Sequence, residues 1–409
     1  MGYSRDVLKG ISWTWLLRMC TRIISFLKIA ILARFLSPAQ FGLYGIASLV
    51  LLLLEVLTET GINVFIIQEN EDVDSIVSTA WIISILRGIL ISLIIILLVP
   101  FITFFFRSPD STNLIILIAL VPFIKGFINP SIVKFQKELM FDKEFYFRGS
   151  LFTLESVSGV LFVLLLRDPV GIIYGLMIGA IAEVILSFLL LKPIPSLSFN
   201  RVKGRKIISR GKWLTLSGIF NYLYHNGDDA VAGRILGTAS LGLYQMAYKI
   251  SMFPINEIGG VVSKVALPVY VRISGDRLRL KRAFIKTSVA VFLLTTPIAV
   301  IFFLFAKEIV LLVLGPAWVS AVPVFKVLSV FGVVRTSIDP IHLVFLSLKK
   351  QEFSVLVNII SFTVMILTII PLITRYGLVG AGIAVILGSL IASPIGFFLA
   401  YKLLHENKK

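Results

Sequence analysis

The stretch "ARFLSPAQFGLY", residues 33–44, recurs two hundred residues later as "GRILGTASLGLY", residues 233–244. The copies share six identities in register: an Arg, an Ala, a Gly, two Leu and a Tyr. A weaker echo relates residues 128–145 to residues 338–353. Because both echoes fall at the same place in each half, the sequence predicts two homologous halves. We expect these halves at residues 1–200 and 201–409.

Composition sets the class of protein. The chain is 57% hydrophobic and only 15% charged, and apolar runs of about 20 residues, the length that crosses a bilayer core of roughly 30 Å, recur from end to end. We therefore predict an all-α polytopic membrane protein, whose single cysteine, Cys20, excludes a disulfide within the chain. The twelve predicted spans cover residues 9–34, 42–66, 76–106, 113–133, 145–166, 169–191, 212–235, 241–268, 285–306, 319–347, 353–374 and 378–403.

The Lys and Arg residues fall mainly on alternate connections between these spans. The positive-inside rule then places both termini in the cytoplasm. One loop, residues 68–75, carries acids and no bases although it should lie on the same side. The longest connections, 192–211 and 269–284, are also expected on that side, the second either flat on the inner leaflet or as a solvated linker. Topology and anionic lipid contact account for most of the net charge of +17, so nucleic acid is not an expected partner.

Six predicted spans separate the two copies of the repeat, so both halves should have the same orientation. A parallel repeat of this kind predicts two six-helix lobes related by an axis along the membrane normal, as in several transporters. Within the repeat, Gly42 and Gly242 are expected to form the tight turn between helices. Tyr44 and Tyr244 are expected in an interfacial aromatic belt.

Three stretches resemble the polysaccharide-transporter family, the Wzx-type oligosaccharide flippases of the multidrug/oligosaccharidyl-lipid/polysaccharide exporter superfamily. They are "LARFLSPAQFGLYGIAS" (32–48), "KELMFDKEF" (137–145) and "NYLYHNGDDAVAGRILGTASLGLYQMA" (221–247). The resemblance implies two six-helix lobes around a central cavity. It also implies an undecaprenyl-pyrophosphate-linked oligosaccharide as substrate, turned from the inner to the outer leaflet. Many members carry two further helices after the twelfth, so a lipid-tail groove built by such helices is not expected in these 409 residues.

Cations inside the first-half spans are candidate substrate-binding residues. Arg18 and Arg22 lie four residues apart and project from one helix face, and Lys28, Arg87 and Lys125 follow in the same half. Four of these five lie well inside their spans and would together cost on the order of 10 kcal/mol if they faced lipid, so they should face protein or water. A pyrophosphate is a multivalent anion that the fork of an Arg guanidinium can bind through two oxygens.

Internal pairing is the alternative for these cations. Glu55 and Glu59, also four residues apart, lie on the next predicted span. They could neutralise Arg18 and Arg22, and they are the acidic candidates for a polar cavity. Both roles could apply in different states of a transporter.

The second half carries a polar stripe. Asn221, His225 and Asp228 recur at helical spacing on an otherwise apolar segment. We expect Asp228 to face a cavity, where it would couple transport to protons or sodium or bind a sugar. Its alternative role is to pair with Arg234 or Lys249, which are themselves candidate substrate-binding residues.

A similar polar set recurs in the tenth predicted span, with Arg335, Asp339 and His342. A local pair between Arg335 and Asp339 would also explain it. Arg34 and Arg234, the repeated arginines, end the first helix of each half. There they either complement the helix dipole or bind substrate.

The sequence shows no phosphate-binding glycine loop, metal-ligand cluster or nucleophile constellation, so we expect neither an enzyme, nor a cofactor, nor an ATP-driven pump. The family resemblance, together with the buried cations, implies a flippase of the bacterial or archaeal cytoplasmic membrane that works by alternating access. Its expected partners are the lipid-linked oligosaccharide and membrane lipids, with a glycan polymerase and other assembly proteins as further candidates. A multidrug or organic-cation exporter, which would need anions in its cavity, and a non-transporting scaffold for glycan assembly are the alternatives.

Overall fold

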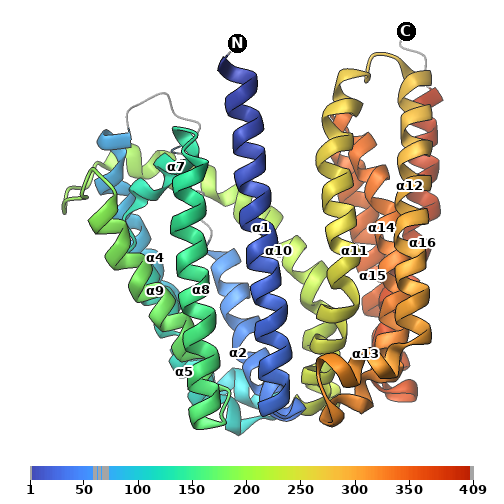
Figure 1. Cartoon of the computed structure of the whole chain (residues 1–409), viewed down its shortest axis with the longest axis horizontal. Coiled ribbons are helices and arrows are strands. Elements are labelled where there is room, and N and C mark those ends of the chain that lie inside the picture. The colour runs from blue at the N-terminus through green and yellow to red at the C-terminus, as the bar shows by residue number, and fades with distance from the viewer. Residues whose placement is uncertain (1, 59–61, 63–65, 67–72, 406–409) are drawn as a thin grey trace. The chain divides into compact units, whose positions relative to one another are not determined.

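The computed structural model describes residues 2–58, 62, 66 and 73–405 (Figure 1), without the side chains of residues 2–9, 11, 73–75 and 210–217. Every regular element in these ranges is a helix. The chain divides into two compact units, Met1–Tyr222 (unit 1) and Leu223–Lys409 (unit 2).

Unit 1 contains long helices and one region of short helical segments between α4 and α8. They are α1 (Gly2–Phe35), α2 (Pro38–Leu57), α4 (Val73–Phe106), η1 (Pro109–Ser111), α5 (Thr112–Ile118), α6 (Leu120–Lys125), η2 (Pro130–Val133), α7 (Lys134–Lys137), α8 (Phe141–Leu166), α9 (Val170–Leu190) and the first part of α10 (Arg201–Leu236).

In the described residues, unit 2 contains the rest of α10 and seven further helical elements. They are α11 (Thr238–Arg272), α12 (Arg277–Leu304), α13 (Ala306–Val313), η3 (Pro316–Ala321), α14 (Val322–Ser347), α15 (Gln351–Tyr376) and α16 (Leu378–His405).

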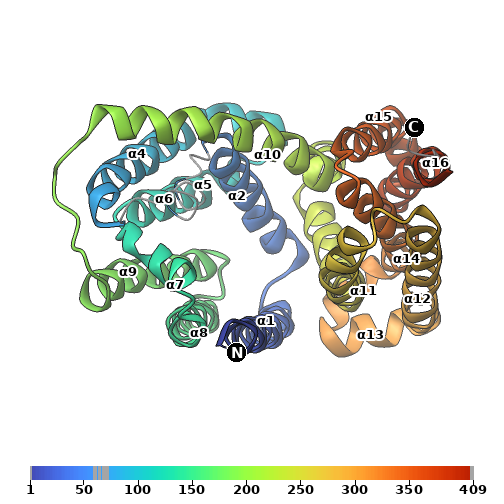
Figure 2. The ribbon, with the colours of Figure 1, turned by 90° about the horizontal axis from the view of Figure 1, so that it is seen from above.

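The units divide within α10 rather than at the boundary expected at residues 200 and 201. The first part of this helix belongs to unit 1, where it runs past α4 (Figure 2). There Ile207 packs into a core with Ile76 and Val77 of α4. The Tyr222 hydroxyl donates to the carbonyl of Leu49 at 2.8 Å. The division into two lobes at residue 200 stays a prediction.

Eight helices among the described residues are long and apolar enough to cross a membrane, and nine if the bent segment before α8 counts as one span. The other three predicted spans, 9–34, 212–235 and 241–268, lie in α1, α10 and α11. These helices are 34, 36 and 35 residues long, so length is not what separates them from the eight. They carry many of the charged residues that the sequence singled out.

The residues that form the repeated turn differ from the glycines that the sequence predicted. Ser37 caps α2 by accepting a hydrogen bond from the Gln40 amide at 3.3 Å, and the Gln40 side chain accepts one from the Ser37 amide at 2.9 Å. In the second copy, Gly237 makes the turn with φ +85°. The prediction that Gly42 and Gly242 form the turns is wrong, because both lie buried inside α2 and α11.

The fourth predicted span, residues 113–133, is broken. Helical segments 109–125 and 130–137 meet at an angle of 74°. Pro130 begins the second segment, where its missing N–H cannot continue a helical hydrogen-bond ladder. At the corresponding place of the weaker echo, Pro340 lies inside the unbroken α14. The two halves therefore differ where their sequences are similar.

The connections expected at residues 192–211 and 269–284 are both shorter than predicted. The first ends where α10 begins at Arg201. α11 continues to Arg272 and α12 begins at Arg277, so only residues 273–276 join them. Asp276 caps α12 by accepting a hydrogen bond from the Arg279 amide at 3.0 Å. The basic residues of this stretch extend the two helices and form no separate surface helix.

Close packing of α8 on α9 fixes one wall of the candidate site. Gly171, Gly175 and Gly179 recur every four residues on α9, a spacing that lets membrane helices approach closely. A Cβ atom at Gly175 would lie 2.5 Å from the Cα of Gly159 on α8, and one at Gly179 would lie 2.9 Å from the Cβ of Glu155. The glycines therefore bring the Glu155 side chain up to the surface of α9.

Candidate functional site: a cationic cavity in unit 1

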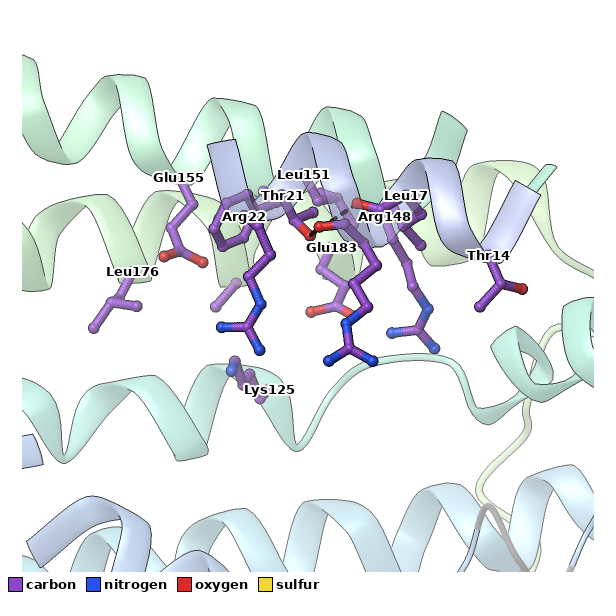
Figure 3. A pocket seen from close by; sticks show the side chains of 14 residues that line it. Thr14, Leu17, Thr21, Arg22, Lys125, Arg148, Leu151, Glu155, Leu176 and Glu183 are labelled. Atoms are coloured by element: carbon purple, nitrogen blue, oxygen red, sulfur yellow. Dashed lines mark hydrogen bonds between the residues drawn. The ribbon is translucent and has the colours of Figure 1, made fainter. Parts of the chain in front are cut away.

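Unit 1 contains a cavity of about 500 Å³, bordered by α1, α6, α8 and α9 (Figure 3). α8 packs between α1 and α9, and α6 packs on α9, so four helices far apart in sequence supply its walls. Four cations outnumber two acids in the lining, which leaves an excess of positive charge. The charged lining residues are Arg18, Arg22, Lys125, Arg148, Glu155 and Glu183.

Three predicted cations meet at this cavity. Arg18 and Arg22 project from α1, and Lys125 comes from the end of α6. Figure 3 shows Arg22 and Arg148 pointing toward the helix that carries Lys125. Lys125 ends the segment that precedes the break, so the unexpected bend lies at the edge of the cavity.

Sequence reasoning missed Arg148, Glu155 and Glu183. Arg148 and Glu155 lie inside the predicted span 145–166, and Glu183 lies inside 169–191. The rule that singled out Arg18, an ionisable side chain within a predicted span, would have found all three.

Two ion pairs orient the charges around the cavity. Lys28 Nζ lies 3.2 Å from Glu155 Oε1, and the Lys28 side chain is only 14% exposed. Lys28 therefore acts as the partner of a lining acid. Arg148 Nε donates to Glu144 Oε1 at 2.7 Å, and the same oxygen accepts a hydrogen bond from Gln136 Nε2 at 2.9 Å.

Arg87 does not line this cavity, although the sequence predicts the same substrate-binding role for it as for Arg18, Arg22 and Lys125. Its Nη2 donates to the carbonyl of Glu55 at 2.7 Å, and its Nε donates to Thr58 Oγ1 at 3.3 Å. Arg87 thus contacts the end of α2. Glu59 lies outside the described residues, and the pairing of Glu55 or Glu59 with Arg18 stays a prediction.

Two residues of the polar stripe of α10, His225 and Asp228, are part of a second cluster, within unit 2. Asp228 is buried and accepts a hydrogen bond of 2.6 Å from the Tyr244 hydroxyl, while Gln245 Nε2 donates to Asp229 Oδ2 at 3.3 Å. Tyr244 is fully buried, so the expectation that it belongs to an interfacial belt is wrong. A buried carboxylate needs such a donor, which the sequence spacing did not reveal.

Arg335 of α14 joins this cluster to His225. One guanidinium nitrogen donates to the Tyr248 hydroxyl, and Nη2 lies 2.5 Å from His225 Nε2. The polar sets predicted separately on the seventh and tenth spans therefore meet in space.

Two small cavities adjoin this network. One, of about 20 Å³, borders Asp228, and the other, of about 150 Å³, borders Asp339 and His342. Both share His225 and Arg335. Neither matches the unit 1 cavity in size, and in the described part of the chain no group of three His, Cys, Asp or Glu could hold a metal ion.

The remaining candidates lie elsewhere. Arg34 and Arg234 occupy the last turns of α1 and α10, as the helix-dipole interpretation requires. Asn221 is exposed and belongs to unit 1, and Lys249 is exposed on α11. A substrate-binding role for Arg34, Arg234 and Lys249 stays a prediction, as does a role of Asn221 in ion coupling or in a polar cavity.

Comparison with known proteins identifies the family. A family described as "Polysaccharide biosynthesis protein" matches residues 31–323. The chain is 27% identical over 406 residues to a Klebsiella pneumoniae "uncharacterized membrane protein in cps region", covering 98% of this chain and 82% of that one. It is 26% identical to the lipopolysaccharide biosynthesis protein WzxC of Escherichia coli strain K12, covering 98% and 81%.

The fold agrees with a solved membrane transporter. The structure of the lipid II flippase MurJ in an inward closed conformation matches with a TM-score of 0.77 at 14% identity, covering 96% of this chain and 89% of that one. This likeness establishes the fold of a multi-pass membrane protein. Because the family match spans well over half of the residues, the chain belongs to the polysaccharide biosynthesis protein family that its repeated turn and neighbouring motifs resemble.

Proposed function

We propose that this protein is a flippase that moves an undecaprenyl-pyrophosphate-linked oligosaccharide from the inner to the outer leaflet of the cytoplasmic membrane. The observation that carries the proposal is the cationic cavity of unit 1, which gathers Arg18, Arg22, Lys125 and Arg148 among membrane helices. Family membership and the flippase fold support it.

The chemistry of the cavity suits a pyrophosphate. Cations at mid-membrane depth are costly, and a multivalent anion can interact favourably with several of them at once. Arg18, Arg22 and Arg148 can each offer two parallel N–H donors to phosphate oxygens, while Lys125 adds a point charge. The acids Glu155 and Glu183 would compete for these cations when no substrate is bound.

Transport requires the cavity to open to each side of the membrane in turn. We assign this alternation to movement of the two lobes, with both termini in the cytoplasm as the Lys and Arg asymmetry indicates. The buried Asp228 cluster of unit 2 is our candidate for coupling to protons or sodium. A glycan polymerase would consume the product on the outer side.

An organic-cation exporter is the main alternative. Such a protein would attract its substrate with acids, whereas cations exceed acids in the unit 1 cavity. A scaffold without transport activity would gain nothing from keeping four cations around a cavity within the membrane.

The test is transport by the full chain in proteoliposomes. A fluorescent undecaprenyl-pyrophosphate-linked oligosaccharide should cross faster than in empty liposomes, measured by quenching of the outer leaflet. A fluorescent phosphatidylethanolamine and an organic-cation dye should cross no faster than without protein. Faster movement of the dye alone would support the exporter and contradict the flippase.

A matched pair of variants links this transport to the cavity. Lys125→Gln removes a lining cation, whereas Lys143→Gln removes an exposed cation on α8 that does not line the cavity. The first should slow oligosaccharide transport at least tenfold and the second should leave it unchanged. Equal effects of the two would remove the cavity from the mechanism.

A further inference from the structure

An apolar groove of about 440 Å³ lies between α11 and α12 of unit 2. On α11, Val261, Val265 and Val269 recur every four residues and stand 46–65% exposed. Residues 261–269 span about 12 Å along the helix axis. The groove therefore has the length of a substantial part of an acyl chain.

Small side chains on α12 create the depression. Ala283, Thr287 and Ala290 follow one another at helical spacing opposite the valine ridge. At the end nearest the turn between the helices, the Tyr270 hydroxyl donates to the carbonyl of Ala283 at 3.4 Å. This hydrogen bond links the two helices at one end of the groove, so the packing of α11 on α12 forms the groove.

Two cations stand on α12 beside the groove. Lys286 lines it, and Arg282 lies one turn away on the same helix face, nearer the turn. Both side chains are exposed, and neither makes a hydrogen bond or ion pair within the part of the chain that the structure describes.

The neighbouring cations differ from them. Arg279 pairs with Asp276 at 3.0 Å, and Lys281 lies 3.0 Å from His405 Nε2 and over the ring of Tyr401. Arg282 and Lys286 differ from these two cations in having no such partner among the described residues. Arg277, whose Nη1 is buried without a hydrogen bond, is not among the residues that line the groove.

We propose that this groove is a binding site for an anionic phospholipid, with an acyl chain against the valine ridge and the phosphate on Arg282 and Lys286. The site is independent of the oligosaccharide cavity. In the orientation given above, it faces the inner leaflet.

Charge complementarity decides the occupant. Inside a membrane an apolar groove gains little from apolar contact alone, because lipid tails already surround it. A second helix would fill the groove but would leave two cations at its mouth without counter-charge. An anionic phospholipid supplies both the chain and the charge, and a juxtamembrane cation attracts anionic lipid by about 1 kcal/mol.

The experiment measures lipid binding to the full chain, purified in detergent, by native mass spectrometry. Phosphatidylglycerol and phosphatidylcholine with identical acyl chains are titrated separately. Two cations at about 1 kcal/mol each predict that phosphatidylglycerol binds about thirtyfold more tightly. The double variant Arg282→Gln and Lys286→Gln should bring this ratio close to one.

Two further variants separate the roles of charge and shape. Lys349→Gln with Lys402→Gln removes two cations that do not line the groove, and the thirtyfold ratio should persist. Ala290→Phe keeps every charge but fills the groove, so it should weaken phosphatidylglycerol binding about tenfold.

Several outcomes would overturn the proposal. Equal binding of the two lipids, or a ratio that survives loss of Arg282 and Lys286, would show that the groove does not select anionic lipid. Displacement of phosphatidylglycerol by an equal concentration of inorganic phosphate would show a phosphate site without a lipid chain. A lipid-free dimer that Ala290→Phe dissociates would show that a second copy occupies the groove. Oligosaccharide transport is measured separately, so its failure would leave these results unaffected.

Discussion

Replacing Arg22 by glutamine tests whether the unit 1 cavity holds the pyrophosphate. The change removes one of the four lining cations while keeping much of the side-chain size. A charge-assisted hydrogen bond contributes about 1.5–3 kcal/mol. Because the Arg22 side chain is exposed, we expect the lower part of this range, about 1.5–2 kcal/mol, or about a 10- to 30-fold loss of affinity.

The assay is binding of the purified protein to an undecaprenyl-pyrophosphate-linked oligosaccharide, together with surface-polysaccharide export in cells whose membrane expression is checked. Arg22→Lys should show a smaller loss, since it keeps the charge and loses the bidentate fork. Glu183→Gln alone should not weaken binding, because it removes only a competing acid from the lining.

The opposite interpretation is that Arg22 only neutralises a neighbouring acid. It predicts that Arg22→Gln strands Glu183 and that the double variant, with Glu183→Gln, recovers export. Such a recovery, or normal binding by well-expressed Arg22→Gln, would refute headgroup binding by this arginine.

Three further predictions concern coupling, packing and topology. Asp228→Asn should impair transport and change its dependence on pH or sodium. Transport that is unchanged at every pH and sodium concentration would show that Asp228 has no role in coupling. Loss of the protein from the membrane would instead indicate a structural role. Gly175→Val, which places a branched side chain against the α8 backbone, should lower the thermal unfolding temperature by several degrees, whereas Gly275→Val, with nothing within 4 Å of its Cβ, should not. Cysteines at Asp110 and Arg205 in a cysteine-free background should react with an impermeant reagent from opposite sides of the membrane, and same-side labelling would contradict the topology.

Much of the architecture could be predicted because a bilayer constrains sequence strongly. Twenty apolar residues must form a helix when no water can satisfy the backbone, so composition alone indicates helices and approximately where they run. The same constraint makes cations such as Arg18 and Lys125 conspicuous, and these two residues line the unit 1 cavity. Family resemblance then came from short motifs that the family match confirms.

Local geometry inside the helices was harder to predict. Identity between the two repeats pointed to Gly42 as the turn residue, yet the turn depends on the Ser37 cap and, in the second copy, on the positive φ of Gly237. Pro130 interrupts a span that hydropathy reads as continuous, while Pro340 in a similar sequence does not. Hydropathy is a sum over residues. It does not show whether each backbone N–H and C=O group has a hydrogen-bond partner.

The sequence by itself determined the class of protein and most of its helical segments, and it indicated many of the costly charges, while the division into two halves stays a prediction. Only the tertiary structure decided which of those charges meet. In the structure, Arg148 lines the same cavity as Arg22 and Lys125. Arg87 instead donates a hydrogen bond to the end of α2, and Arg335 contacts His225. Spacing along one helix fixes which residues share a face, but partners on other helices depend on packing, which here follows from contacts such as the glycine stripe of α9 against α8.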